Sequence, residues 1–101
     1  EFLLTAEHFS AQRALELGLI NEIVEEEELE ARSLDWARRI TANAPMAVQA
    51  TKESVLRGLG GSLEEAYGVE ADLSKRVFQS EDAKEGPKAF AEKRPPRWSG
   101  R

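Results

Sequence analysis

The sequence predicts a mainly α-helical fold, with four or five helices and one short strand. Ser62 and Glu65 match a capping box, the strongest local sign of a helix start in this chain. Apolar residues after Glu28 recur at helical spacing, whereas only residues 19–24 have the β-branched pattern of a strand. We expect a single domain over residues 1–101 with a thin core, because a chain of this size buries about 60–70% of its unfolded surface.

The first two helices are predicted from their start and stop signals. Ser10 is the expected N-cap of a short helix over residues 11–17, and Gly18 is its expected end. A second helix is predicted over residues 29–40, with the acidic run 25–28 at its positive end. We interpret this run as a dipole complement and a solvated face. Successive helical carboxylates point around the cylinder, so they would not converge on one metal ion.

Two longer helices are expected over residues 45–59 and 62–78. A proline suits the first position of the former, and glycines at 58, 60 and 61 end it in a flexible turn. That turn lacks the preceding strand and the following Lys-Ser/Thr of a phosphate-binding loop, so we disfavour a phosphate-binding role. Apolar residues lie on more than one side of both helices, which predicts that part of their surface meets another domain or subunit.

The last part of the chain is a basic tail, residues 84–101, with a formal charge of +4 after a body of −9. Ser80 is the expected cap of a helix that reaches about Lys93, although Gly86-Pro87 is expected to interrupt or restart it. Residues 94–98 should lie extended over the surface. This charge pattern favours a small anionic partner and disfavours nucleic acid, because the acidic body would repel a long polyanion.

Composition excludes several kinds of chemistry. The chain has no cysteine and one histidine, His8, which we interpret as structural or exposed. The carboxylate pairs Glu64/Glu65 and Glu81/Asp82 diverge by about 100° on a helix, so neither is expected to be an acid–base pair. We therefore expect no catalytic residue, no metal site and no covalently bound cofactor. No signal peptide or membrane span is recognisable, and we expect a cytoplasmic protein.

Phe90 and Lys93 are the candidate binding residues. Placed three apart on a helix, an aromatic ring and an ammonium group would lie side by side. A ring can stack on a purine while an ammonium meets a phosphate, which is the chemistry needed to hold a nucleotide-bearing anion. On spacing alone, the simpler interpretation remains open: Phe90 is a core residue and Lys93 a solvated edge.

Several segments together resemble the C-terminal third of the enoyl-CoA hydratase/isomerase, or crotonase, family. Each segment is weak alone, and their order and spacing across nearly all 101 residues make the combined match specific. The segments are Leu3-Leu4-Thr5, Phe9-Ser10-Ala11 with Ala14, Gly18-Leu19-Ile20-Asn21, Ala44-Pro45-Met46-Ala47-Val48 with Thr51-Lys52, Ser80-Glu81-Asp82-Ala83-Lys84-Glu85-Gly86, Ala89-Phe90, Glu92-Lys93-Arg94 and Pro96.

The resemblance implies that the chain is the helical C-terminal domain of a crotonase-like α/β enzyme. In the longer parent chain, an N-terminal spiral of ββα units binds an acyl-CoA and stabilises a thioester enolate with two backbone N–H groups. In the hydratases of the family, glutamates of that spiral manage the water and the proton. These elements lie upstream of the matched part, so we expect the segment alone to be inactive.

The resemblance also implies a task for the C-terminal part. In the family this part packs against neighbouring subunits, commonly in trimers paired into hexamers, and it helps to close the pocket for the adenosine end of CoA. Residues matching Phe90 and Lys93 are implicated there, with CoA entering as part of the substrate. Pro87 departs from the helix-friendly apolar residue usual in the family, which puts the geometry of Lys84 and Lys88 in doubt.

A second hypothesis also fits the sequence. The chain could be a free-standing helical interaction module that assembles partners without catalysis. The sequence does not distinguish a hydratase from an isomerase or another relative, because side chains upstream of the matched part make that choice.

Overall fold

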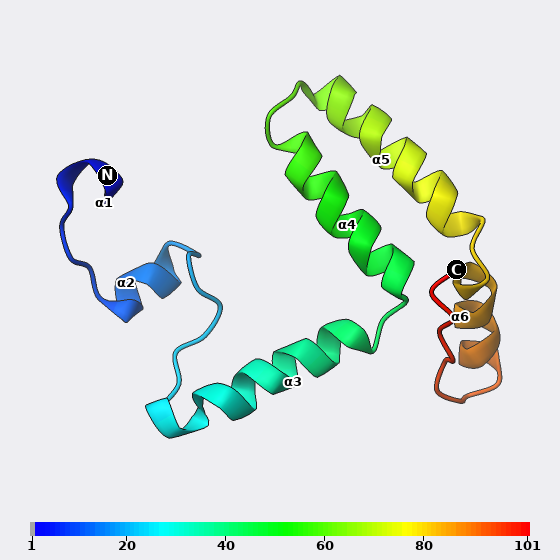
Figure 1. The fold of residues 1–101 in the computed structure, drawn as a ribbon, viewed down its shortest axis with the longest axis horizontal. Coiled ribbons are helices and arrows are strands. Elements are labelled where there is room, and N and C mark those ends of the chain that lie inside the picture. The colour runs from blue at the N-terminus through cyan, green and yellow to red at the C-terminus, as the bar shows by residue number, and fades with distance from the viewer. Residues whose placement is uncertain (1) are drawn as a thin grey trace. The chain divides into compact units, whose positions relative to one another are not determined.

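The computed structural model describes residues 2–101. The chain forms two compact units, one that ends at Trp36 and one over Ala37–Arg101, and the division falls within a helix. The mainly helical prediction is confirmed (Figure 1). The element order is α1 (Phe2–Thr5), α2 (Ala11–Glu16), the 3₁₀ turn η1 (Glu26–Glu28), α3 (Leu29–Thr41), α4 (Pro45–Gly58), α5 (Leu63–Phe78) and α6 (Asp82–Ala91).

In the first unit, α2 begins and ends as its sequence predicts. The Ser10 hydroxyl accepts a hydrogen bond from the Arg13 N–H at 3.1 Å, as an N-cap does. Beyond α2, Gly18 adopts a φ of +72°, the left-handed conformation that glycine reaches without steric cost. The rings of Phe2 and Phe9 stack with their centroids 3.9 Å apart.

Residues 19–24 do not form the predicted strand, and the described residues 2–101 contain no strand. A strand needs a neighbouring strand to complete its backbone hydrogen bonds, and within this part of the chain the segment has none. Side chains fix the segment to α3 instead. The Glu22 carboxylate accepts hydrogen bonds from the Arg32 guanidinium and, at 3.1 Å, from Nε1 of Trp36.

In the second unit, α4 and α5 form an antiparallel hairpin (Figure 1). Pro45 opens α4 as predicted. The predicted capping box is present at the start of α5: the Ser62 hydroxyl accepts from the Glu65 N–H at 3.2 Å, and the Glu65 carboxylate accepts from the Ser62 N–H at 2.7 Å. A Cβ on Gly58 would lie 3.4 Å from the Ala66 Cβ, so the two helices approach closely near their loop.

The hairpin buries little of its apolar surface. Of the residues of α4 and α5, Leu73 alone is a buried hydrophobic residue. Leu59, between the helices, and Phe78, at the end of α5, are each 78% exposed. An open groove of about 430 Å³ lies between the helices, lined by residues of α4 such as Val55 and of α5 such as Val77. Much of the apolar surface of these helices is therefore exposed in this chain, and the prediction that part of it meets another domain or subunit stays a prediction.

Ser80 forms the corner between α5 and α6. Its buried hydroxyl donates to the Val77 carbonyl at 2.7 Å and accepts from the Ala83 N–H at 3.1 Å, which confirms its predicted capping role. The predicted interruption at Gly86-Pro87 is wrong, because α6 continues through Pro87. Proline removes only one N–H, the expected partner of the Ala83 carbonyl, and side-chain contacts described below hold the helix. No described helix is both long enough and apolar enough to span a bilayer.

Candidate functional site

The candidate site lies at the C-terminal end of α6. The helix ends at Ala91, so Lys93 is not on it, and the expected shared helical face of Phe90 and Lys93 is wrong in detail. Lys93 adopts a φ of +52°. Its N–H donates to the Phe90 carbonyl at 3.2 Å, and the Arg94 N–H donates to the Ala89 carbonyl at 3.0 Å. These two bonds form a Schellman motif with Lys93 at its left-handed position.

The end of α2 forms the same motif, with glycine, the residue that the motif favours, at the left-handed position. There the Gly18 N–H donates to the Leu15 carbonyl at 3.0 Å, and the Leu19 N–H donates to the Ala14 carbonyl at 2.9 Å. A left-handed conformation costs a residue with a side chain about 1 kcal/mol more than it costs glycine. Ala6 is the other described non-glycine residue with a positive φ. Lys93 therefore occupies a position where glycine would be the more stable residue.

Phe90 presents its ring to solvent. Its side chain is 87% exposed, whereas the neighbouring Ala89 is 1% exposed and faces the interior of the unit. The simpler interpretation of Phe90 as a core residue is therefore wrong. Lys93 is exposed as well, and its backbone bond to Phe90 fixes the two residues within one turn of chain. The structure thus places an accessible aromatic ring and an accessible ammonium group at one helix end.

Glu85 holds the chain that follows this helix end. Its Oε1 and Oε2 accept from Nη1 and Nη2 of Arg94 at 2.6 and 2.9 Å, a bidentate pair. Oε1 also accepts from the Arg97 N–H at 2.7 Å. Nε of Arg94 donates to Glu92 at 2.6 Å. The tail is thereby attached to the first turn of α6.

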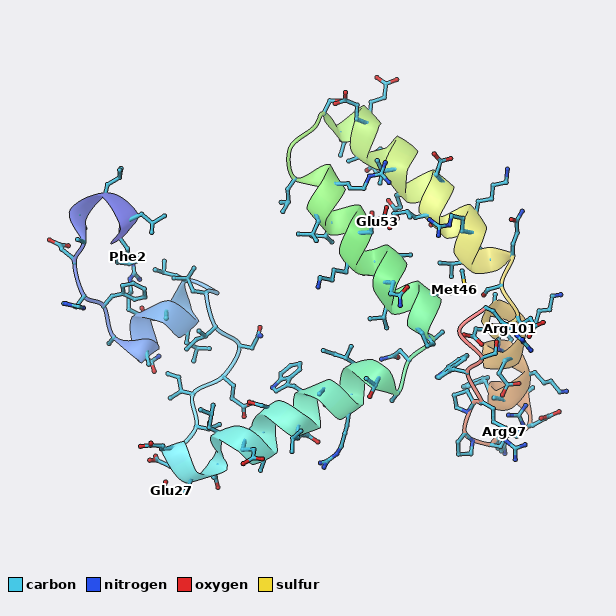
Figure 2. The ribbon with its side chains drawn as sticks, viewed as in Figure 1. Phe2, Glu27, Met46, Glu53, Arg97 and Arg101 are labelled. Atoms are coloured by element: carbon cyan, nitrogen blue, oxygen red, sulfur yellow. The ribbon has the colours of Figure 1, made fainter. Side chains whose placement is uncertain are left out.

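Asp82 holds the last residues of the chain in the same way. It is 3% exposed. Its Oδ1 accepts from the N–H and the hydroxyl of Ser99 at 2.6 and 3.0 Å, and its Oδ2 accepts from the Gly100 N–H at 2.9 Å. We call Asp82, Glu85 and these hydrogen-bond partners the tail clasp. Figure 2 shows the labelled Arg97 and Arg101 in the tail beside α6.

Trp98 completes the attachment of the tail. Its Nε1 donates to the Ala42 carbonyl at 2.7 Å. Its ring lies against α6 where Gly86 leaves room, since a Cβ on Gly86 would be 3.4 Å from the nearest ring atom. The predicted course of the tail, extended over the surface, is confirmed, and its attachment is closer than the sequence indicated.

Hydrogen bonds within the clasp change the pKa values of its charged groups. The Arg94 guanidinium and the Arg97 N–H hold the pKa of Glu85 at about 2, below its ordinary 4.5. The Ser99 N–H lowers the pKa of Asp82 below 3.8, assisted by Gly100. The Glu85 carboxylate raises the pKa of Arg94. All three groups are therefore charged at neutral pH.

The clasp was not predicted from the sequence. Its carboxylates were visible as acidic residues near a turn, and the basic tail was visible as well. The hydrogen bonds between the carboxylates and the tail join residues that are 9 to 18 positions apart. Helical periodicity predicts contacts only between residues three or four positions apart, so it does not indicate these. Lys84 and Lys88 remain one turn apart despite Pro87, and with Arg97 they line an open hollow of about 270 Å³. The described residues contain no group of three or more side chains that could hold a metal ion.

The structure and the sequence match proteins of one class, the enzymes that act on CoA thioesters. A solved enoyl-CoA hydratase/isomerase from Mycobacterium paratuberculosis superposes with a TM-score of 0.89 at 48% identity, over 94% of this chain and 38% of that chain. An enoyl-CoA hydratase from Mycobacterium tuberculosis is 41% identical over 100% of this chain and 38% of its own length. A carnitinyl-CoA dehydratase from Proteus mirabilis is 43% identical over 100% of this chain and 40% of its own length.

The family model described as enoyl-CoA hydratase/isomerase matches residues 1–101. The chain belongs to the enoyl-CoA hydratase/isomerase family. It spans about 40% of the length of the curated relatives it matches, and the matched portion is their C-terminal part. The predicted family and the predicted helical C-terminal domain are both confirmed.

Proposed function

We propose that residues 1–101 form the C-terminal part of an enzyme that acts on an acyl-CoA thioester, and that the end of α6 contacts the nucleotide end of CoA. One observation carries the proposal: Lys93 occupies a left-handed position that glycine fills in the same motif at Gly18. Backbone strain of this kind clusters at functional sites. The left-handed conformation of Lys93 therefore supports a role for its ammonium group.

The chemistry of CoA suits this helix end. CoA carries an adenine, a 3′-phosphate and a diphosphate, which together call for an aromatic surface and positive charge. The exposed ring of Phe90 can stack on the adenine, and the Lys93 ammonium can meet a phosphate. Lys84, Lys88 and Arg97 add positive charge along α6 and the tail, where two of the nearby carboxylates are already engaged in the tail clasp.

We assign no catalytic residue to this chain. The reaction would be set by an N-terminal part of the kind that the longer relatives possess, either hydration or isomerisation of the acyl-CoA double bond, in the cytoplasm. Residues 1–101 alone would be inactive. The exposed apolar side chains of α4 and α5 support a second task in the same enzyme, because such a surface is stable when another subunit covers it. We propose a homo-oligomer, a trimer or hexamer, whose contacts include this hairpin.

A chimeric enzyme, which we call the joined enzyme, tests the assignment of Lys93. In it, residues 1–101 would be fused after the N-terminal part of the Mycobacterium tuberculosis enoyl-CoA hydratase, and that N-terminal part would set the chemistry. Two substrates would be compared: crotonyl-CoA and crotonyl-pantetheine, which lacks the nucleotide. We expect Lys93→Ala to lower kcat/KM for crotonyl-CoA about tenfold, the loss of one charge-assisted contact. It should leave kcat/KM for crotonyl-pantetheine unchanged.

The matched control is Lys75→Ala, which removes the same charge from an exposed site on α5. We expect it to change neither value. Equal losses on both substrates would show that Lys93 supports the fold, and an unchanged kcat/KM for crotonyl-CoA would refute the assignment. A joined enzyme that hydrates neither substrate would contradict the proposal that this chain completes such an enzyme.

A further inference from the structure

Glu85 is linked to the residues on both sides of Lys93. It binds the residue that follows Lys93 directly, and the guanidinium of that residue binds the one that precedes Lys93. It binds the Arg94 guanidinium with both carboxylate oxygens, and the same guanidinium binds Glu92. Glu92 and Arg94 are the two sequence neighbours of Lys93. The side chain of Glu85 is 18% exposed and that of Arg94 is 30% exposed, so the pair is partly shielded from water. Partly buried, bidentate pairs fix geometry far better than exposed ones.

The direction of the chain after α6 depends on this pair. With φ at +52°, Lys93 turns the chain back so that Arg94 lies along the flank of α6 and reaches Glu85, nine residues earlier. A lysine prefers a negative φ, which would send the following residues elsewhere and rotate the Cα–Cβ bond of Lys93. The contacts of Glu85 with Arg94 and with the Arg97 N–H oppose that change. They therefore select the backbone state in which the Lys93 side chain leaves the helix end in one direction.

We infer that Glu85 is a positioning residue, which acts through Arg94 to hold Lys93 in the left-handed conformation that presents its ammonium group to the CoA nucleotide. The inference rests on the proposed function of Lys93 and adds a residue that would not touch the ligand itself. A merely structural clasp would hold the tail without affecting recognition of the nucleotide. The two roles differ in what a substitution of Glu85 does to each substrate.

The test uses the joined enzyme with Glu85→Gln, Lys93→Ala and the double variant. Glutamine keeps the shape of Glu85 and removes the charge that binds the guanidinium. We expect Glu85→Gln to raise KM for crotonyl-CoA about fivefold with kcat unchanged, and to leave both constants for crotonyl-pantetheine unchanged. The double variant should match Lys93→Ala alone, because a positioning residue has no effect once the group it positions is absent.

Two further variants sharpen the result. Glu81→Gln makes the same change on an acid next to α6 whose ion pair with Arg101 is exposed, and it should leave both substrates unaffected. Arg94→Lys keeps the positive charge and loses the bidentate geometry, so it should raise KM for crotonyl-CoA as Glu85→Gln does.

Each outcome bears on a different claim. If Lys93→Ala lowers kcat/KM for crotonyl-CoA while Glu85→Gln leaves its KM unchanged, the positioning role is overturned and the proposed function stands. Additive effects in the double variant, or equal losses on both substrates from Glu85→Gln, also overturn it. If Lys93→Ala has no effect on crotonyl-CoA, the proposed function has failed, and the positioning role fails with it.

Discussion

Replacing Lys93 with glycine is expected to stabilise the protein and to weaken its recognition of CoA at the same time. Glycine adopts a φ of +52° without steric cost, so the free energy of unfolding should rise by about 1 kcal/mol. The same change removes the ammonium group, so kcat/KM of the joined enzyme for crotonyl-CoA should fall about tenfold. Urea unfolding and steady-state hydration of crotonyl-CoA measure the two effects.

Gly18→Lys is the matched control. It places a lysine at the equivalent position of the motif that ends α2, where a Cβ would meet no atom within 4 Å. Its cost is therefore conformational, and we expect a loss of about 1 kcal/mol in the free energy of unfolding with no change in kcat/KM for crotonyl-CoA. A fall in stability on Lys93→Gly would instead mean that the lysine side chain makes stabilising contacts that outweigh the cost of its left-handed backbone.

The tail clasp is expected to open in acid. Glu85 and Asp82 have lower pKa values in the folded state than in the unfolded chain, so their contribution to stability is complete above about pH 4.5. It decreases as pH falls from 4.5 towards 2 for Glu85, and below 3.8 for Asp82, because the unfolded state then binds more protons. Protonated carboxyl groups bind N–H groups and guanidinium more weakly. Hydrogen-exchange protection of Arg97, Ser99 and Gly100 should therefore decline over this range.

Asp82→Ala should produce part of this effect at neutral pH. Removing a buried acceptor leaves the Ser99 and Gly100 N–H groups without their partner, so their protection should fall about tenfold. Protection of the Arg97 N–H should persist, because Glu85 still accepts from it. The amides of α4 serve as the internal reference in both experiments. Unchanged protection of Ser99 and Gly100, either in acid or in this variant, would show that the tail is held by other contacts.

Local chemistry predicted most of the helices. The caps at Ser10 and Ser62, and the glycine end at Gly18, depend on a few neighbouring residues, and each lies where the sequence placed it. The prediction of a strand over residues 19–24 was wrong, because β-branched side chains alone do not provide a neighbouring strand with which to pair. The predicted interruption at Pro87 was wrong: α6 continues through it, and the clasp attaches the tail to Asp82 and Glu85, in the part of α6 before the proline.

The candidate site was predictable in part. The sequence placed an aromatic ring and a lysine near the end of the last helix, and both side chains are exposed there. It gave no sign of the positive φ at Lys93. That conformation accompanies the contact of Arg94 with Glu85, and a contact between residues nine positions apart follows from the folded path of the chain. Membership of the family, in contrast, was predicted from the order and spacing of short matching segments, and it is confirmed by the match over residues 1–101.

Binding of adenosine 3′,5′-bisphosphate to the joined enzyme tests whether Lys93 recognises the nucleotide end of CoA. This compound has the adenine and the 3′-phosphate of CoA, and it lacks the pantetheine and the acyl group. Calorimetry would compare its Kd for the unaltered joined enzyme and for Lys93→Ala. We predict that the substitution raises Kd about tenfold, or about 1.4 kcal/mol, and leaves the Kd of pantetheine unchanged. An equal Kd for adenosine 3′,5′-bisphosphate in the two proteins would contradict the claim that Lys93 recognises the nucleotide end of CoA.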